Sequence, residues 1–244
     1  MPPDMPFKPA LIVVDMQNDF CPPDGSLAVP GGREIVPLIN ELLASPMFEV
    51  KVSTQDWHPS DHISFAANHT APNNKPFESF IEMKNLVGNR PEQTMMQRLW
   101  PVHCVQGTRG AEIIDELDVS KVDVNVRKGM DARVEMYSAF SDSFGNMTEG
   151  AGGVDLDLAS FLHARHITHV YVVGLAGDYC VKDTARGAAK AGFATYVIED
   201  AQRCVDPDPA AWAEVKRVLQ QDSVEVVHAQ SNEVRRVLQP CGQL

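Results

Sequence analysis

The sequence predicts an α/β fold that is doubly wound, with a mainly parallel six-stranded sheet and helices on both of its faces. Short apolar segments rich in Val, Ile and Leu alternate with longer segments of helical periodicity, which is the pattern of repeated strand–helix–strand units. The 244 residues are 44% hydrophobic, and no stretch resembles a linker. We therefore expect one domain over residues 1–244 with a single core.

The first two strands are expected at residues 10–15 and 48–54. The segment 10–15 (ALIVVD) is apolar until it stops at the carboxylate of Asp15. A Pro/Gly-rich loop then leads to a helix over residues 33–44, whose apolar residues recur at a spacing of three and four. The second strand runs directly into the polar segment QDWHPSDH.

A long excursion separates the second strand from the third. Residues 65–100 are largely polar and lack sustained periodicity, and the segment is too long for an ordinary connection. We expect it to be a lid or a partly ordered excursion. A short helix at residues 111–117 and a third strand at residues 122–127 follow, and this strand leads into Lys128.

The second half of the chain centres on the strand 169–175 (HVYVVGL), which is broken by glycines before a helix begins at about Tyr179. Its β-branched and aromatic residues are typical of a strand that is buried on both faces. The other elements expected here are helices at residues 155–164, 209–221 and 231–238 and strands at residues 194–200 and 223–229.

Composition limits the possible partners and compartments. The net charge of −12 without a cluster of Lys or Arg argues against nucleic acid, because phosphate binding needs a positive surface. No apolar run approaches the length of a membrane span, and the first residues lack the pattern of a signal peptide. Five cysteines without a CxxC pair suit reduced thiols. We expect a cytoplasmic protein with a small-molecule substrate; a nuclear or peroxisomal presence and a homo-oligomer stay open.

Chemically useful residues follow the ends of several predicted strands. Cys180 lies where a strand passes into a helix, and the positive end of a helix lowers the pKa of a thiol there; an isolated cysteine, however, is more often a core residue. Asp15, Asp56 with His58, and Lys128 each lie at or just past the end of a different strand. Since ligands bind outside the carboxyl ends of parallel strands, we expect these side chains to meet at one edge of the sheet.

A metal site is the second expectation. Asp56 and His58 alternate by two residues, so on an extended backbone both side chains point to the same side and can share an ion. His103, after the excursion, is the candidate for a third ligand. His62 and His69 are interpreted as solvated loop residues.

Five segments, in this order, carry a resemblance to a known family: VVDMQNDF, QDWHPSDHISF, LWPVHC, RKGMD and GLAGDYCV. They resemble the nicotinamidases of the isochorismatase-like cysteine hydrolase superfamily, and the long excursion resembles fungal and other eukaryotic members most. The resemblance implies a catalytic triad of Asp15, Lys128 and Cys180. It implies that Asp56, His58 and His103 bind one divalent metal ion, zinc or alternatively iron or manganese.

The same resemblance assigns further residues. The backbone N–H groups of Ala176 and Cys180 would form the oxyanion hole, with a non-prolyl cis peptide bond next to Ala176. Phe20, Trp100 and Tyr137 would form the walls of the ring pocket. Gly177 departs from the family pattern, because many relatives have Thr in this loop. His62 matches a position that is a metal ligand in some relatives only.

The implied reaction is hydrolysis of nicotinamide to nicotinic acid and ammonia through a cysteine acyl-enzyme, a step of NAD salvage, with the metal ion orienting the pyridine ring. One alternative is a metal-independent cysteine amidohydrolase of the same fold that acts on N-carbamoyl compounds or ureidoacrylate. The other is a non-catalytic module that binds a metal or a ligand. The predicted metal site argues against the first alternative and the intact triad against the second.

Overall fold

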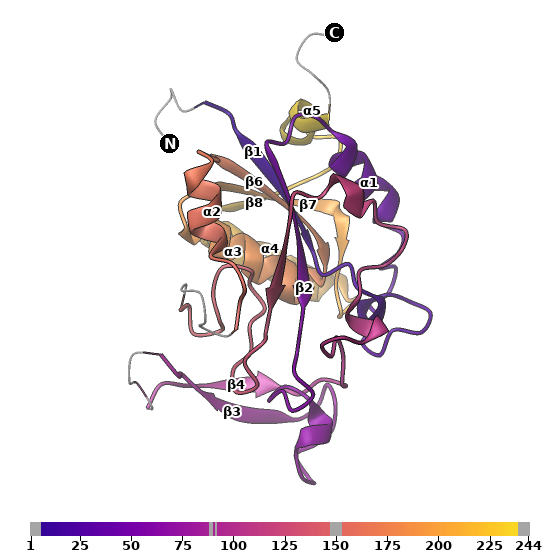
Figure 1. Ribbon diagram of the computed structural model, residues 1–244, viewed down its shortest axis with the longest axis vertical. Coiled ribbons are helices and arrows are strands. Elements are labelled where there is room, and N and C mark those ends of the chain that lie inside the picture. Colours follow the sequence, from indigo (N-terminus) through magenta and orange to yellow (C-terminus); the bar gives the residue numbers. More distant parts are fainter. Residues whose placement is uncertain (1–5, 88–89, 91, 147–152, 239–244) are drawn as a thin grey trace.

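A computed structural model describes residues 6–87, 90, 92–146 and 153–238 (Figure 1). Its centre is a six-stranded parallel sheet with the spatial order β5-β2-β1-β6-β7-β8. The strands are β1 (Pro9–Val14), β2 (Val50–Asp56), β5 (Val124–Lys128), β6 (His169–Leu175), β7 (Ala194–Arg203) and β8 (Val224–Val227). The predicted fold class is thereby confirmed, and each predicted strand is present with bounds that differ by a few residues.

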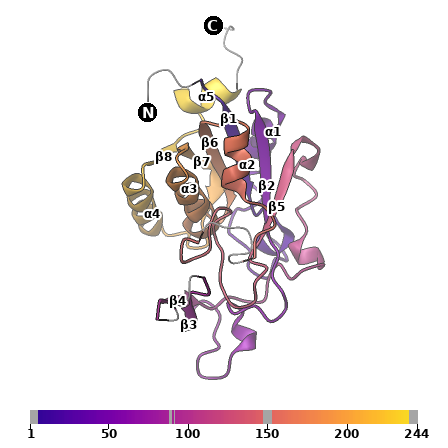
Figure 2. The same ribbon diagram turned by 60° about the vertical axis from the view of Figure 1, so that its left-hand side comes forward.

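Helices cover both faces of the sheet. α1 (Val36–Ala44) and α5 (Asn232–Leu238) pack on one face, whereas α2 (Leu158–Ala164), α3 (Lys182–Lys190) and α4 (Pro209–Gln221) pack on the other (Figures 1 and 2). The apolar residues of each central strand divide between the two faces because successive side chains of a strand point to opposite sides. In β1, Leu11 and Val13 join the first cluster, and Ala10, Ile12 and Val14 join the second.

The order of the strands reverses between β1 and β6. From β1 the chain proceeds to β2 and β5 toward one edge of the sheet, and from β6 it proceeds to β7 and β8 toward the other edge. The connections therefore diverge between β1 and β6. Ligands of such sheets bind outside the carboxyl ends of the strands at this point.

The excursion contains regular structure that the sequence did not predict. β3 (Phe80–Lys84) and β4 (Thr94–Arg98) form an antiparallel hairpin, which lies beyond the carboxyl ends of the parallel strands (Figure 1). Met83 is buried, while its neighbours Glu82 and Lys84 are exposed. Polar residues on the exposed face thus hid the strand character of this segment.

The helix predicted at residues 111–117 is wrong. The chain forms a 3-10 turn at Arg109–Ala111, and Ile113 then makes a β-bridge to Gln17. The carbonyl of Ala111 accepts hydrogen bonds from the side-chain amides of Gln17 at 2.9 Å and Gln55 at 2.7 Å. These long-range partners hold the segment in an irregular conformation against the strand ends.

Other element bounds differ by shorter amounts. α1 begins three residues later than predicted, with Pro37 in its first turn. α2 begins after Asp157, whose side chain accepts a hydrogen bond from the N–H of Ser160 at 3.0 Å. The helix predicted from Tyr179 onward is a π-helical turn, Gly177–Val181, followed by α3.

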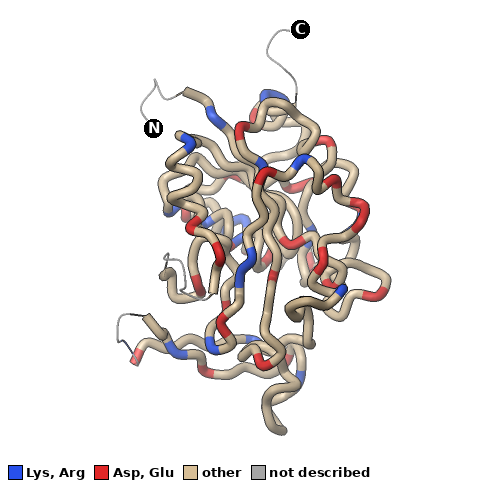
Figure 3. Tube along the Cα trace, viewed as in Figure 1, with Lys and Arg blue, Asp and Glu red and all other residues tan. Residues whose placement is uncertain are grey.

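Acidic and basic residues are interspersed over the described chain (Figure 3). Over the whole sequence 33 acidic residues outnumber 21 basic ones. Within the described residues, no helix has both the length and the apolar character that a membrane span needs.

Candidate active site

Four strand ends bring the predicted triad and Asp56 together. Asp15 directly follows β1, Asp56 is the last residue of β2, and Lys128 is the last residue of β5. Asp56 and Lys128 are also paired in the register of β2 and β5. Cys180 lies in the π-helical turn after β6, and all four residues are buried. The convergence expected from the sequence is therefore present.

Lys128 lies at the centre of this group. Its ammonium nitrogen Nζ is 2.9 Å from Asp15 Oδ2 and 3.5 Å from Cys180 Sγ, and it also donates to Asp56 Oδ1. A further contact of 3.3 Å joins Nζ to the carbonyl oxygen of Met136. A fully buried lysine is thus surrounded by two carboxylates and a thiol.

Burial and charge act in opposite directions on these groups. Burial alone would lower the pKa of Lys128, but Asp15 and Asp56 raise it well above its usual range. Burial raises the pKa of Asp15, although Lys128 and a hydrogen bond of 2.5 Å from the Thr54 hydroxyl oppose the shift. An ammonium next to a carboxyl group of raised pKa is suited to proton transfer.

The thiol of Cys180 does not have the lowered pKa that its position at a helix start suggested. Burial raises its pKa well above the usual range, and Lys128 offsets this only in part, while Asp15 and Asp56 raise it further. The expectation is corrected because the residue is only 5% exposed, so desolvation outweighs the helix end. The thiol therefore keeps its proton until a base removes it.

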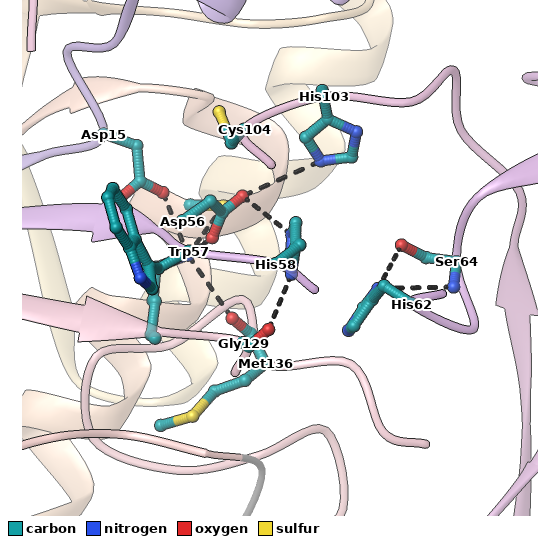
Figure 4. Close-up of polar contacts among 12 residues, drawn as sticks. Asp15, Asp56, Trp57, His58, His62, Ser64, His103, Cys104, Gly129 and Met136 are labelled. Atoms are coloured by element: carbon teal, nitrogen blue, oxygen red, sulfur yellow. Dashed lines mark hydrogen bonds and ion pairs between the residues drawn. The ribbon is translucent and has the colours of Figure 1, made fainter. Parts of the chain in front are cut away.

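Asp56 also faces two histidines on its other side (Figure 4). Its Oδ2 atom is 3.5 Å from His58 Nε2 and 3.9 Å from His103 Nε2. The second ring nitrogen of each histidine is held by a backbone carbonyl: His58 Nδ1 donates to Gly129 at 2.7 Å, and His103 Nδ1 donates to Pro101 at 2.8 Å. These bonds direct both Nε2 atoms toward Asp56, as outer contacts do in metal sites.

The three residues fit a divalent cation. Their ligand atoms all lie within 4.8 Å of one another, and His58 Nε2 is buried without a hydrogen-bond partner among the described residues. Burial and the neighbouring His58 lower the pKa of His103 to about 4, so its imidazole is neutral as a ligand must be. Burial alone would raise the pKa of Asp56, but Lys128 and His58 lower it strongly, so it is a carboxylate.

His62 is not the solvated loop residue that the sequence suggested. It is fully buried, its ring stacks on His58 with centroids 4.0 Å apart, and its Nδ1 lies 2.8 Å from Ser64 Oγ (Figure 4). Glu135 was not singled out at all, yet it is buried and its carboxyl oxygen lies within 4.8 Å of a ring nitrogen of both His58 and His62. Burial raises the pKa of Glu135.

The predicted ring-pocket residues lie on two sides of the site. Phe20 is buried with its ring 5.4 Å from that of His103. On the other side, Trp100 Nε1 donates to the hydroxyl of Tyr137 at 3.0 Å. Both of these rings contact Tyr179, at centroid distances of 4.9 and 5.4 Å. Tyr179 was missed, although it directly precedes Cys180.

The backbone at the end of β6 agrees with the expected cis bond. The peptide bond between Leu175 and Ala176 is cis and lies directly before the π-helical turn. A cleft of about 840 Å³ opens nearby between the β3–β4 hairpin and α3. Tyr137 and Tyr179 line this cleft, whereas Cys180 does not. The cleft therefore reaches Tyr179, the residue directly before the thiol, but not the thiol itself.

Comparisons with known proteins identify the family and the fold. The isochorismatase domain family matches residues 9–231. A nicotinamidase of Acinetobacter baylyi is 41% identical over 214 residues, which cover 84% of this chain and 87% of that protein. The crystal structure of yeast nicotinamidase bound to the inhibitor nicotinaldehyde has a TM-score of 0.81 and 37% identity, covering 90% of this chain and 99% of that one. Pyrazinamidase of Pyrococcus horikoshii in complex with zinc has a TM-score of 0.66 and 32% identity, with coverages of 91% and 99%.

Proposed function

The chain belongs to the isochorismatase family, and we infer that it is a nicotinamidase, a hydrolase that converts nicotinamide to nicotinic acid and ammonia in NAD salvage. The observation that carries this function is the position of Asp56, which contacts Lys128 through one oxygen and faces two histidines through the other. An amide-hydrolysing group and a cluster suited to a ring-holding ion therefore lie side by side.

We propose Cys180 as the nucleophile. Its thiolate would attack the carboxamide carbon to give an acyl-enzyme, which splits a difficult hydrolysis into two easier steps. Asp15 would take the thiol proton and return it to the departing ammonia, and then take a proton from the water that releases the acid. The raised pKa of Asp15, which burial causes, supports this role, because it makes the carboxylate a better proton acceptor than an exposed one.

Lys128 would hold the two reacting groups in place. Its contacts to Asp15 Oδ2 and Cys180 Sγ, at 2.9 and 3.5 Å, support a role in stabilising the thiolate and orienting the carboxylate. The backbone N–H groups of Ala176 and Cys180 are proposed to receive the oxyanion. Their location in the turn directly after β6 supports this assignment.

Asp56, His58 and His103 would hold one divalent ion. When bound, such an ion would supply a Lewis acid with open coordination positions for the pyridine nitrogen. The mixed set of one carboxylate and two imidazoles suits zinc, and iron or manganese also accept these ligands. Phe20 on the side of His103, and Trp100 and Tyr137 on the side of Cys180, would then flank the ring.

The test is ammonia release from nicotinamide by the purified, metal-loaded protein. We expect turnover of nicotinamide, slow turnover of benzamide, and none of an N-carbamoyl amino acid or of ureidoacrylate. Cys180→Ala should abolish turnover, whereas Cys21→Ala, which removes a buried cysteine outside the triad, should preserve it. Release from the open-chain compounds but not from nicotinamide would instead support the metal-independent amidohydrolase, and release from none would support a binding module.

Residence in the cytoplasm, the absence of a nucleic-acid partner and the homo-oligomeric state stay predictions. Fractionation of cells, binding to labelled DNA or RNA, and sedimentation of the purified protein test them in turn. The extent of a single domain over residues 1–244 is likewise proposed, and one cooperative unfolding transition would support it.

A further inference from the structure

The turn that carries Cys180 begins at a residue without a side chain. The structure leaves no room for a side chain at Gly177. A Cβ atom on Gly177 would lie 1.8 Å from Gln202 Oε1 and 2.9 Å from Cys204 Sγ. Both distances are far below van der Waals contact, so Gly177 and the side chain of Gln202 are mutually dependent.

A bulge in β7 brings Gln202 to this position. Val172 pairs with Val197, but Gly174 pairs with Gln202, so a single residue of β6 faces the four residues 198–201 of β7. This register shift is larger than that of an ordinary bulge, which has one extra residue, but it likewise redirects the side chains that follow it. Beyond the bulge, β7 pairs again with the last two residues of β6, which lie immediately before the turn.

The side chain of Gln202 is held in this place. It is 6% exposed, and its Oε1 atom lies 3.5 Å from Cys204 Sγ, which donates the hydrogen bond. Burial raises the pKa of Cys204 to about 12, so the S–H donor persists at neutral pH. The carboxamide is therefore a fixed part of the wall behind the turn.

The following residue, Asp178, provides a second attachment on the same side. Its carboxylate accepts hydrogen bonds from the backbone N–H groups of Val205 at 2.9 Å and Asp206 at 3.0 Å. The start of the turn is thus hydrogen-bonded to the segment 202–206 at Asp178, and it packs closely against Gln202 at Gly177. Ala176 and Cys180, whose N–H groups are the proposed oxyanion donors, lie on either side of these attachments.

We propose that Gln202 is a positioning residue for the amidase reaction. Its carboxamide occupies the space of the missing side chain at Gly177 and braces the turn that presents Cys180. This role rests on the proposed function, because the geometry that it maintains is that of the nucleophile and the oxyanion donors. Gln202 itself need not touch the substrate.

The proposal predicts that two harmful substitutions compensate each other. Gln202→Ala removes the brace and should lower kcat about 10- to 100-fold, since misplacement by about 1 Å costs that much. Gly177→Thr forces an overlap with Gln202 and should lower kcat at least as much. In the double variant the threonine fills the space that the glutamine has left, and the Cys204 thiol, which has lost its hydrogen bond to Gln202, is free to turn away from the new side chain. We therefore expect kcat to recover most of the loss.

The experiment measures kcat per folded molecule, KM for nicotinamide and the melting temperature for the unmutated protein, both single variants and the double variant. Gln220→Ala, on the exposed side of α4, is the matched control and should behave as the unmutated protein. Positioning predicts that kcat falls while KM changes by no more than about two-fold, because the ion cluster and the aromatic walls come from other segments. A purely structural role would lower the melting temperature and leave kcat per folded molecule unchanged, which would overturn the proposal.

Two further results would also overturn it: an unchanged kcat of Gln202→Ala, or a double variant no more active than Gly177→Thr. If a single variant does not fold, the double variant tests the proposal alone. An active double variant supports compensation, and an inactive one contradicts it. Failure of the unmutated protein to release ammonia would refute the proposed nicotinamidase function. If the unmutated protein is active but the loss of kcat in the double variant equals the sum of the losses in the two single variants, only the role of Gln202 is refuted.

Discussion

Replacement of Lys128 by Met should make the Cys180 thiol harder to ionise. Lys128 is the one group in this cluster that lowers the thiol pKa, and its Nζ is 3.5 Å from Sγ. At an effective dielectric constant of about 20, two unit charges at that distance interact by about 5 kcal/mol. Since one pKa unit corresponds to about 1.4 kcal/mol, the full effect would be about three and a half units.

The observed shift should be smaller than this limit. Without the ammonium, Asp15 holds its proton more tightly and ceases to repel the thiolate, which compensates part of the loss. We therefore expect a rise of at least about one unit. Because the thiol already titrates above its usual range, this rise appears as an alkylation rate at least about tenfold lower at each pH from 7 to 9.

The assay follows alkylation of Cys180 by iodoacetamide, with mass spectrometry of the Cys180 peptide to separate it from the other thiols. Asp15→Asn is the matched control, and it should change the thiol pKa in the opposite direction, because it removes a negative charge that raises this pKa. Alkylation should become faster in Asp15→Asn and slower in Lys128→Met, although both variants should lose turnover. A change of the same sign in both would show that access to the sulfur, and not charge, controls the rate.

Loss of folding is the main complication. Removing the buried lysine leaves two buried carboxylates without their ammonium partner, which costs about 3 to 5 kcal/mol. The double variant Lys128→Met, Asp15→Asn removes one charge of each sign and should recover part of this stability. An alkylation rate in folded Lys128→Met equal to that of the unmutated protein would refute the electrostatic role of Lys128.

Three other perturbations test separate parts of the site. Cys180→Ala should abolish turnover but keep nicotinamide binding within a few-fold by calorimetry, because the contacts to the ring lie elsewhere; retained turnover would rule out the nucleophile. Removal of the metal by a chelator, or His103→Ala, should weaken binding of nicotinamide far more than that of benzamide, which lacks the ring nitrogen; equal losses for the two ligands would argue against coordination of that nitrogen. Tyr137→Phe removes the hydroxyl group that accepts hydrogen bonds from both Gln97 and Trp100. It should lower the free energy of unfolding by about 1 to 3 kcal/mol for each donor left unpaired, and an unchanged melting temperature would contradict this.

The sheet and the meeting of the catalytic candidates were predictable because parallel strands share one polarity. The apolar runs that end at Asp15 and at Leu175 mark their strands clearly, and the carboxyl ends of such strands lie at the same edge. Lys128 could be included because its strand, though more polar, is followed by a glycine and an irregular segment. No knowledge of the order of the strands was needed for this step.

Burial could not be inferred in the same way for residues in irregular segments. His62 was expected to be solvated because proline and polar residues surround it, yet its neighbour Ile63 bonds to Ala132 and Ser64 bonds to Trp100 through the backbone. These partners are 69 and 36 residues away. The same limit explains the thiol of Cys180, since its pKa depends on a depth of burial that several separate segments create together.

The bulge in β7 was hidden for a different reason. The sequence predicts a strand over residues 194–200 that ends at the acidic pair Glu199 and Asp200, with a loop beyond it. These two residues lie within the bulge, where Glu199 accepts hydrogen bonds from Trp212 at 2.7 Å and Lys216 at 3.0 Å of α4. The polar residues that seem to end the strand therefore hold the bulge, and the strand resumes beyond them at Gln202.

Asp56 joins the two halves of the site and limits what its own substitution can reveal. Its Oδ1 atom accepts from Lys128, and its Oδ2 atom faces His58 and His103. Asp56→Asn would remove a candidate metal ligand and one of the two carboxylates that balance a buried lysine, so a loss of activity could have either origin. His103 lies on the Oδ2 side, 3.9 Å from Asp56, and its ring is held from a separate segment by the carbonyl of Pro101. Substitution of His103 therefore perturbs the ion cluster while it leaves the charges around Lys128 and Cys180 in place, and it is the sharper probe of what the metal contributes.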